Sequence, residues 1–298
     1  MRRRSPVAAA ALGLALLWAL PARSQPVASV DGRGRMVRLA SPPRRIVSLA
    51  PAVTEILFAL GVGDRVVGAT AFCDYPPAAR RIPRVGDSTI SVEKIVSRRP
   101  DLVVASGSAD RKAIDAMERM PSFRVPIFVV DPNSFEGLYA AIGAIGRIVG
   151  RPQQAAALCG SIRARVDAVV RAVSARADRP KVLIVVQPEP LWVAGSGTFM
   201  DEMVRLAGGV DVAGGAGTGY HTFPIEKALA ARPDVVLVGK EGLSRIRSSE
   251  LWKATPAYRS NRIDAINPSI AARPGPRLAD ALEQIARLLH PGIVFGRR

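Results

Sequence analysis

Short apolar runs alternate along this chain with longer stretches in which apolar residues recur every three or four positions. The runs have the length and the Val and Ile content of buried strands, and the longer stretches have the period of helices with one buried face. The predicted strands are 46–49, 66–68, 102–105, 127–130, 182–186 and 235–238. This alternation predicts an α/β fold with parallel sheets.

Two segments that lie far apart share one order of residues. Residues 92–104 read VEKIVSRRPDLVV, and residues 225–237 read IEKALAARPDVVL. In each, a proline follows Glu93 or Glu226 by seven positions, and an apolar run comes after it. Because the residue before a proline disfavours the helical conformation, each segment predicts a short helix that ends there and is followed by a buried strand.

A second pair of similar segments precedes the first. Residues 54–64 and 201–211 each predict a helix that begins at Thr54 or Asp201, carries a glutamate in its first turn and ends at glycine. The same order of elements therefore occurs in each half of the chain, which predicts two related lobes.

Between the halves, residues 151–177 predict one long helix. Pro152 suits its first turn, and at 1.5 Å per residue the helix would span roughly 40 Å. We expect two Rossmann-like lobes with parallel sheets, residues 25–150 and 178–298, joined by this helix. A ligand cleft should lie between them, beyond the carboxyl ends of the strands. The apolar stripe of the helix is formed by Leu158, Ile162, Val166, Val169 and Val173.

Residues 1–24 predict a signal peptide. Three arginines precede an apolar run over 7–20, and small residues at 22 and 24 suit cleavage near Ser24 and Gln25. The apolar run is short for a membrane span, and no cysteine follows the cleavage point to carry a lipid. We therefore expect an exported protein that begins near Gln25 and carries no lipid anchor.

Charge and cysteine content narrow the picture further. The formal charge is +17, but the arginines are dispersed and form no dense block, so we expect no nucleic-acid partner. Cys73 and Cys159 lack the spacing of a metal or redox motif. They could form one disulfide in an oxidising compartment, a pairing that sequence alone leaves open.

Motifs for catalysis are missing. The chain has no G-x-S-x-G elbow, no Walker A loop and no G-x-G-x-x-G turn, so we expect neither an enzyme nor an intrinsic cofactor. It contains two histidines, too few for a bare metal site. His290 reads as a helix-end residue. His221 follows Tyr220 in a predicted cleft loop, where it is either a hydrogen-bonding residue or an axial ligand of a bound metal chelate.

Several motifs together resemble one family. RIVSLAPAVTEILFALG (45–61), CDYPPAARRIPRVG (73–86), the Glu93 repeat and RPGPRLADALEQIARLLHP (273–291) are similar to ABC transporter substrate-binding proteins with a rigid helical backbone. This group includes cobalamin-, haem- and ferric-siderophore-binding proteins. The resemblance covers nearly the whole chain after the predicted signal peptide. It implies a monomer that captures a small molecule and delivers it to an ABC permease dimer with its ATPase.

The cobalamin-binding members look most similar, and their pattern implies a ligand site. It falls on Ala52, Phe72, Trp192, Tyr220 and Arg273. Aromatic faces with one cation would suit a large planar macrocycle with polar edges. The alternative is that Phe72 and Trp192 are core residues.

The resemblance leaves the cargo open. We expect a corrinoid, with its cobalt, or another metal chelate, namely haem or a ferric siderophore. Haem-binding members usually place a tyrosine after the Val-Gly pair, whereas Asp87 follows Gly86 here, although Tyr220 or His221 could still ligate iron. A more distant alternative is an exported sensor or enzyme on the same scaffold.

Glu93 and Glu226 resemble the pair that docks into basic pockets of the two permease subunits in this family. Taken singly, each would be a first-turn glutamate that offsets the helix dipole. Equivalent placement in two lobes favours docking onto a two-fold partner, and the dipole role is compatible with it.

Overall fold

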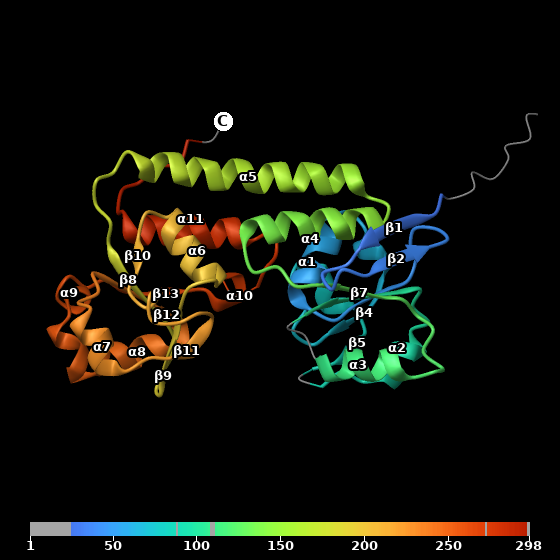
Figure 1. The fold of residues 1–298 in the computed structure, drawn as a ribbon, viewed down its shortest axis with the longest axis horizontal. Helices are drawn as coiled ribbons and strands as arrows, with labels where there is room; N and C mark the ends of the chain where they lie inside the picture. Colours follow the sequence, from blue (N-terminus) through green and yellow to red (C-terminus); the bar gives the residue numbers. More distant parts are fainter. Residues whose placement is uncertain (1–24, 88, 108–110, 272, 297–298) are drawn as a thin grey trace, which may run out of the picture.

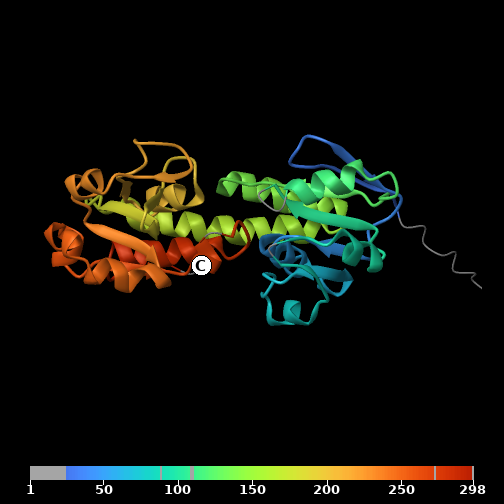
Figure 2. The ribbon, with the colours of Figure 1, turned by 90° about the horizontal axis from the view of Figure 1, so that it is seen from below.

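One long helix, α5 (Pro152–Ser174), lies across both of two α/β lobes, which sit side by side, and joins them (Figures 1 and 2). The computed structural model describes residues 25–87, 89–107, 111–271 and 273–296, so the predicted signal peptide lies outside the described residues. The helix predicted at 151–177 is confirmed to within three residues at each end. Its 23 residues span roughly 35 Å.

The first lobe is built on a parallel sheet, as predicted. Its strand order is β5-β4-β3-β6-β7. The strands are β3 (Ile46–Ser48), β4 (Val66–Thr70), β5 (Arg84–Gly86), β6 (Leu102–Ser106) and β7 (Ile127–Val130). The helices are α1 (Pro51–Ala59), α2 (Val92–Ser97), α3 (Arg111–Arg119) and α4 (Phe135–Ile148), with 3-10 turns η1 (Gly63–Arg65) and η2 (Pro77–Arg81). An unpredicted antiparallel hairpin, β1 (Val27–Val30) and β2 (Met36–Leu39), precedes them.

The second lobe has a mixed sheet, so the prediction of a parallel sheet is wrong there. Strands β10, β8, β12 and β13 are parallel, but β9 and β11 run antiparallel to their neighbours. Only Glu189 and Pro190 separate β8 from β9, and a parallel crossover needs a dozen or more residues. The strands are β8 (Lys181–Pro188), β9 (Leu191–Ala194), β10 (Val210–Asp211), β11 (Tyr220–Thr222), β12 (Val235–Gly239) and β13 (Ile263–Ile266).

Helices cover both faces of this second sheet. Those towards α5 are α6 (Phe199–Leu206), α10 (Pro268–Ala271) and α11 (Leu278–Leu289). Those on the other face are α7 (Ile225–Ala230), α8 (Lys240–Ser248) and α9 (Pro256–Arg259), with η3 (Glu250–Ala254). One continuous apolar core contains residues of α1, α4, α5, α6 and α11, so the two lobes share a single interior along α5. None of the helices in the described ranges is both long and apolar enough to cross a membrane.

The internal repeat has a structural counterpart at the end of its helices. Glu93 and Glu226 both lie in the first turn of their helices, α2 and α7, as predicted. After each helix an arginine adopts the left-handed conformation, with φ of 47° at Arg99 and 50° at Arg232, directly before the proline. In both lobes the chain therefore ends the helix with the same left-handed arginine.

The aspartate of each Arg-Pro-Asp sequence also has the same role in both lobes. Asp101 accepts a hydrogen bond from the backbone N–H of Arg45, at 2.9 Å, just before β3. Asp234 accepts one from the backbone N–H of Lys181, at 2.8 Å, where β8 begins. Each aspartate therefore ties the start of its own strand to the start of the neighbouring one. This structural role explains why the aspartate occurs in both halves of the chain without reference to any ligand.

The helices predicted to begin at Thr54 and Asp201 begin earlier. The first, α1, starts at Pro51, and Thr54 is buried with its hydroxyl 2.8 Å from the hydroxyl of Ser48. The second, α6, starts at Phe199 and is capped by the side chain of Thr198. Neither Thr54 nor Asp201 therefore caps its helix, although both are residue types that often do.

Both cysteines are free thiols in the structure. Cys73 is buried with its sulfur 3.2 Å from the hydroxyl of Thr70, and Cys159 lies apart on α5. His290 caps the end of α11, as predicted, and is fully buried. Its ring nitrogens lie 3.0 Å from a carboxylate oxygen of Asp178 and 3.0 Å from the carbonyl oxygen of Ala207, so it holds the C-terminal helix to the second lobe.

Asp211 generates a prediction about stability. Its side chain is buried, one carboxylate oxygen has no partner among the described residues, and burial together with nearby Asp201 raises its pKa to about 7. Because the folded chain holds this proton more tightly than the unfolded chain does, stability is lost as the pH rises from about 4 to about 7.

Asp211→Asn keeps the shape of the side chain and removes the charge. We expect its stability relative to the wild type to grow by roughly 1 kcal/mol for each pH unit across that window and to stay constant above it. Denaturant unfolding at pH 4, 6 and 8 measures this difference. An equal difference between the two proteins at all three pH values would contradict the prediction.

Candidate functional site

A cavity of about 500 Å³ lies between the two lobes. The first lobe contributes Asp131, Pro132 and Asn133, which directly follow β7. The second lobe contributes Val186 near the end of β8 and Tyr220 at the start of β11, together with the residues around the start of α6. The cavity therefore lies beyond the carboxyl ends of β7 and β8, where the topology predicted a cleft.

Exposed aromatic side chains gather beside the cavity on the second lobe. Tyr220 lines it and is 50% exposed, and Trp192 on β9 is 39% exposed. Trp192 pairs with Thr222, and Tyr220 pairs with Ala194, so both rings lie on one face of the β9–β11 pair as diagonal neighbours. Large apolar side chains left open to solvent in one place are typical of a binding surface.

The interpretation of Phe72 and Trp192 as core residues is wrong. Phe72 is 54% exposed and follows β4 at the carboxyl edge of the first sheet. Ala52, in contrast, is buried in the first turn of α1. A Cβ atom on Gly275 would lie 3.5 Å from the Cα of Ala52, so the segment 273–277 passes directly over it. Of the five residues predicted for the ligand site, Tyr220 is the one that lines the cavity among the described residues, and Ala52, Phe72, Trp192 and Arg273 do not.

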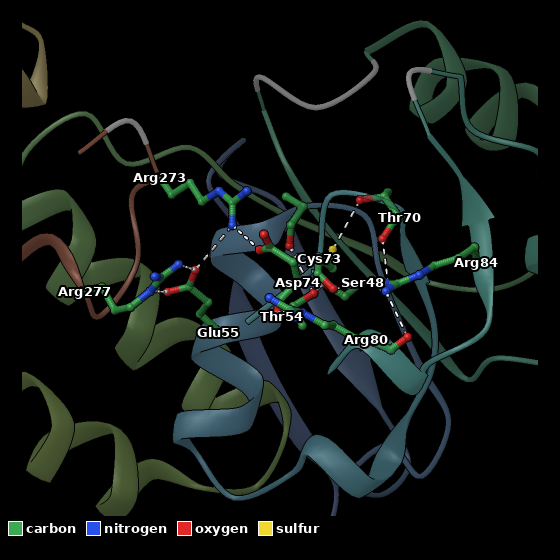
Figure 3. A network of polar contacts seen from close by, with 11 residues as sticks. Ser48, Thr54, Glu55, Thr70, Cys73, Asp74, Arg80, Arg84, Arg273 and Arg277 are labelled. Carbon is green, nitrogen blue, oxygen red and sulfur yellow. Dashed lines mark hydrogen bonds and ion pairs between the residues drawn. The ribbon is translucent and has the colours of Figure 1, made fainter. Parts of the chain in front are cut away.

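Arg273 is an ion-paired residue in this structure, although it was expected to be the cation of the ligand site. Figure 3 shows it directed towards Asp74 of the first lobe, with 2.5 Å between the guanidinium and the carboxylate oxygen. A second carboxylate, Glu55 on α1, lies 3.9 Å from the same nitrogen. Burial pushes the pKa of Asp74 up, but the hydrogen bond and charge of Arg273 more than offset this and lower it.

Arg277 completes the contact between segment 273–277 and the first lobe. Its guanidinium donates to both carboxylate oxygens of Glu55, at 2.9 and 2.5 Å, and Glu55 is only 4% exposed. It also stacks on the ring of Tyr75, 4.0 Å from the centroid. The hydrogen bonds to Glu55 raise the pKa of Arg277. We call this segment, which belongs to the second lobe and binds the first, the crossing segment.

A second bridge joins the lobes on the side of α4. The carboxylate of Glu202 on α6 accepts the backbone N–H of Phe135, at 2.9 Å, in the first turn of α4. The rings of Phe135 and Phe199 meet edge to face with centroids 6.1 Å apart. Burial raises the pKa of Glu202. A carboxylate at a helix N-terminus is favourable, so this contact and the crossing segment together fix the walls of the cavity.

His221 is not directed into the cavity. It alternates with Tyr220 along β11 and therefore faces the other side of the sheet, where its ring meets Phe223 edge to face. One ring nitrogen lies 3.3 Å from the carbonyl oxygen of Gly219, and the other is buried without a partner among the described residues. No group of three or more His, Cys, Asp or Glu side chains in the described ranges could hold a metal ion.

The comparisons with known proteins decide the family. Residues 46–269 match the sequence profile described as periplasmic binding protein, which covers more than half of the chain. This chain belongs to the periplasmic binding protein family. An uncharacterized ABC transporter substrate-binding lipoprotein from Bacillus subtilis is 32% identical to it over 89% of this chain and 86% of its own length.

Two further relatives differ in their ligands. The vitamin B12-binding protein of Vibrio cholerae is 27% identical over 83% of this chain and 90% of its own length. The solved structure of the periplasmic heme-binding protein RhuT from Roseiflexus is 30% identical over 83% of this chain and 98% of that protein, with a TM-score of 0.74. The relatives are binding proteins, and their names do not agree on one cargo.

Glu93 and Glu226 are both exposed in this periplasmic binding protein. Figure 1 places their helices, α2 and α7, on separate lobes and on the side of the molecule away from α5. A backbone hydrogen bond and one from the hydroxyl of Ser91, at 2.9 Å, lower the pKa of Glu93. The side chain is therefore held as a carboxylate at the surface.

Sequence reasoning missed the first-lobe wall of the cavity and the partners of Arg273. Asp131 and Asn133 follow a strand that was predicted correctly. Because ligands bind beyond the carboxyl ends of parallel strands, these two residues could have been predicted as part of the site. Asp74 follows β4 at the same edge, so its position could be expected, but its pairing with Arg273, 199 residues away, could not. Glu55 carries no such signal, because it lies on α1 and is 222 residues away from Arg277.

The crossing segment generates the second prediction. Arg277→Ala removes both hydrogen bonds of the buried Glu55 carboxylate and leaves only Arg273, at 3.9 Å, near it, so we expect the free energy of unfolding to fall by about 3 kcal/mol. Arg245→Ala breaks an ion pair with Glu189 in which both side chains are mostly exposed, and it should cost less than about 1 kcal/mol. Denaturant unfolding compares the two variants. Equal losses would mean that the Glu55 pair does not hold the lobes together.

Proposed function

We propose that this periplasmic binding protein captures a corrinoid, a cobalt macrocycle of the cobalamin type, and delivers it to an ABC importer. The observation that carries the choice is a set of exposed aromatic side chains, of which Tyr220 lines the cavity and Trp192 is its neighbour on the same face. Trp192 and Tyr220 share one face beside a largely apolar cavity, and Phe72 is exposed at the edge of the other lobe. When aromatic rings stack on a planar macrocycle, binding is stabilised both by the burial of apolar surface and by the stacking contact.

Haem is the second candidate. The chain is 30% identical to a heme-binding protein of known structure, and the phenol of Tyr220 lies at the cavity, where its oxygen could ligate iron. His221 is a poor candidate for this role, because its ring faces the other side of the sheet. A ferric siderophore remains the third cargo of this class, and an exported sensor or enzyme on the same scaffold is the distant alternative.

The delivery step is proposed to use Glu93 and Glu226. Two exposed glutamates, one per lobe and on one side of the molecule, match a permease dimer that offers two equivalent basic pockets. The importer would consist of this permease dimer and its ATPase, and the binding protein would act as a monomer. We further propose that residues 1–24 are a signal peptide cleaved near Ser24 and Gln25, that the protein works in the periplasm, and that it is not an enzyme.

The cargo is tested by titration with cyanocobalamin. Trp252 is buried in the second lobe, so Trp252→Phe leaves Trp192 as the tryptophan that reports on the cleft after removal of residues 1–24. We expect saturable quenching of its fluorescence, and loss of about 1–3 kcal/mol of binding free energy on Trp192→Ala, measured by calorimetry. Flat titrations with corrinoids, with saturable binding of haem or a ferric siderophore, would replace the cargo and keep the importer role.

The docking role is tested separately. Glu93→Ala with Glu226→Ala should abolish stimulation of the importer's ATPase and leave cargo affinity within about twofold, because both side chains lie outside the cavity. Lys94→Ala with Lys227→Ala is the matched control, since these exposed residues are the next positions in the same helices. A loss of cargo affinity in the glutamate variant, or an equal loss of stimulation in the lysine variant, would contradict the docking role.

A further inference from the structure

We propose that Asp131 is the specificity-determining residue of the cavity and that it selects metal chelates with amide groups on their rim over those with carboxylates. The inference rests on the proposed function, because it assumes that the cavity between the lobes receives the cargo. It goes beyond that function by naming the chemistry that distinguishes one macrocycle from another.

The charge of the cavity wall points to this residue. Among the lining residues that the structure describes, Asp131 is the only one with a formal charge, and the others are apolar or neutral. Its side chain is exposed, and its carboxylate makes no hydrogen bond or ion pair with the residues of the described ranges. It is therefore a free hydrogen-bond acceptor at the edge of an apolar cavity.

The local backbone places this carboxylate beside Gly107. Asp131 directly follows β7, and the neighbouring strand β6 is followed by Gly107, whose backbone N–H binds the carbonyl oxygen of Val130 at 2.8 Å. A Cβ atom on Gly107 would lie 2.4 Å from a carboxylate oxygen of Asp131, so the glycine makes room for the side chain. Asn133 adds an amide to the same wall.

The arginines of the crossing segment already form ion pairs with other carboxylates. Arg273 and Arg277 on the crossing segment meet Asp74 and Glu55, so that two positive charges face two negative ones (Figure 3). The group contributes no net charge to the cleft. An anionic ligand rim would therefore meet the Asp131 carboxylate without a compensating arginine among the lining residues that are described.

These charges predict opposite outcomes for two kinds of ligand rim. A primary amide can donate an N–H to the Asp131 carboxylate, and a bond to a charged acceptor is stronger than one between neutral groups. A carboxylate on the rim would be repelled and would leave Asp131 without a donor. Because the chain carries a formal charge of +17, or +13 (17 − 4) without the four arginines of residues 1–24, it attracts anions in general, and a local carboxylate is a means of rejecting them at the site.

The test uses pairs of ligands with the same macrocycle. The first pair is dicyanocobinamide, which carries amides, and dicyanocobyrinic acid, which carries carboxylates at the same ring positions. The second pair is haem dimethyl ester and haem, whose rim carries esters or carboxylates. Affinities are measured by calorimetry for the wild type, for Asp131→Asn and for Asp167→Asn, an exposed position on α5 that makes the same change in net charge.

We expect wild-type protein to bind the amide corrinoid at least about tenfold more tightly than the carboxylate corrinoid. Asp131→Asn should reduce this ratio to less than about threefold, chiefly by improving the affinity for the carboxylate form, and Asp167→Asn should leave the ratio unchanged. If only haem compounds bind, the corrinoid proposal fails, and a preference for the ester that disappears in Asp131→Asn still supports the role of Asp131.

Three results would overturn the inference. A ratio that is the same in the wild type and Asp131→Asn would remove Asp131 from ligand selection while the cargo proposal survives. A ratio that changes equally in Asp167→Asn would reduce the effect to net charge. Failure of all four compounds to bind would overturn the inference together with the proposed function.

Discussion

The carboxylate of Glu55 is buried in the first lobe, and the charge that balances it belongs to the second. An isolated buried carboxylate is costly, whereas the paired arrangement with Arg277 satisfies both of its oxygens. The crossing segment must therefore stay docked for the first lobe to keep its interior. Because the same segment carries Arg273 and Pro274, this one pairing also sets the charge balance and one wall of the cavity.

The two lobes share a scaffold and differ where the cavity is formed. The common parts are the left-handed arginine after each exposed helix and the aspartate that ties neighbouring strands together, Asp101 in one lobe and Asp234 in the other. The differences are the β9–β11 pair with its aromatic face and the Asp131 wall opposite. An internal repeat therefore explains how the frame is built, and departures from the repeat explain what the frame can bind.

The sequence predicted those parts of the fold that depend on local patterns. The long helix, the first-lobe sheet and the helices of Glu93 and Glu226 follow from apolar period and from prolines that end helices. Strand β9 was not predicted, and its antiparallel direction follows from the turn of two residues, Glu189 and Pro190, that separates it from β8. The pairing of Arg273 was missed because a charge in sequence gives no sign of which distant carboxylate will meet it.

The shared interior along α5 has a consequence for the rate at which an importer would take up cargo. The distance between α2 and α7 is set by a helix and a core that exist before any cargo arrives. If these helices face the permease, a binding protein without cargo presents them at almost the same separation as one with cargo. Vacant and loaded copies would then compete for the same transporter, and the rate of uptake would depend on their ratio as well as on the supply of cargo.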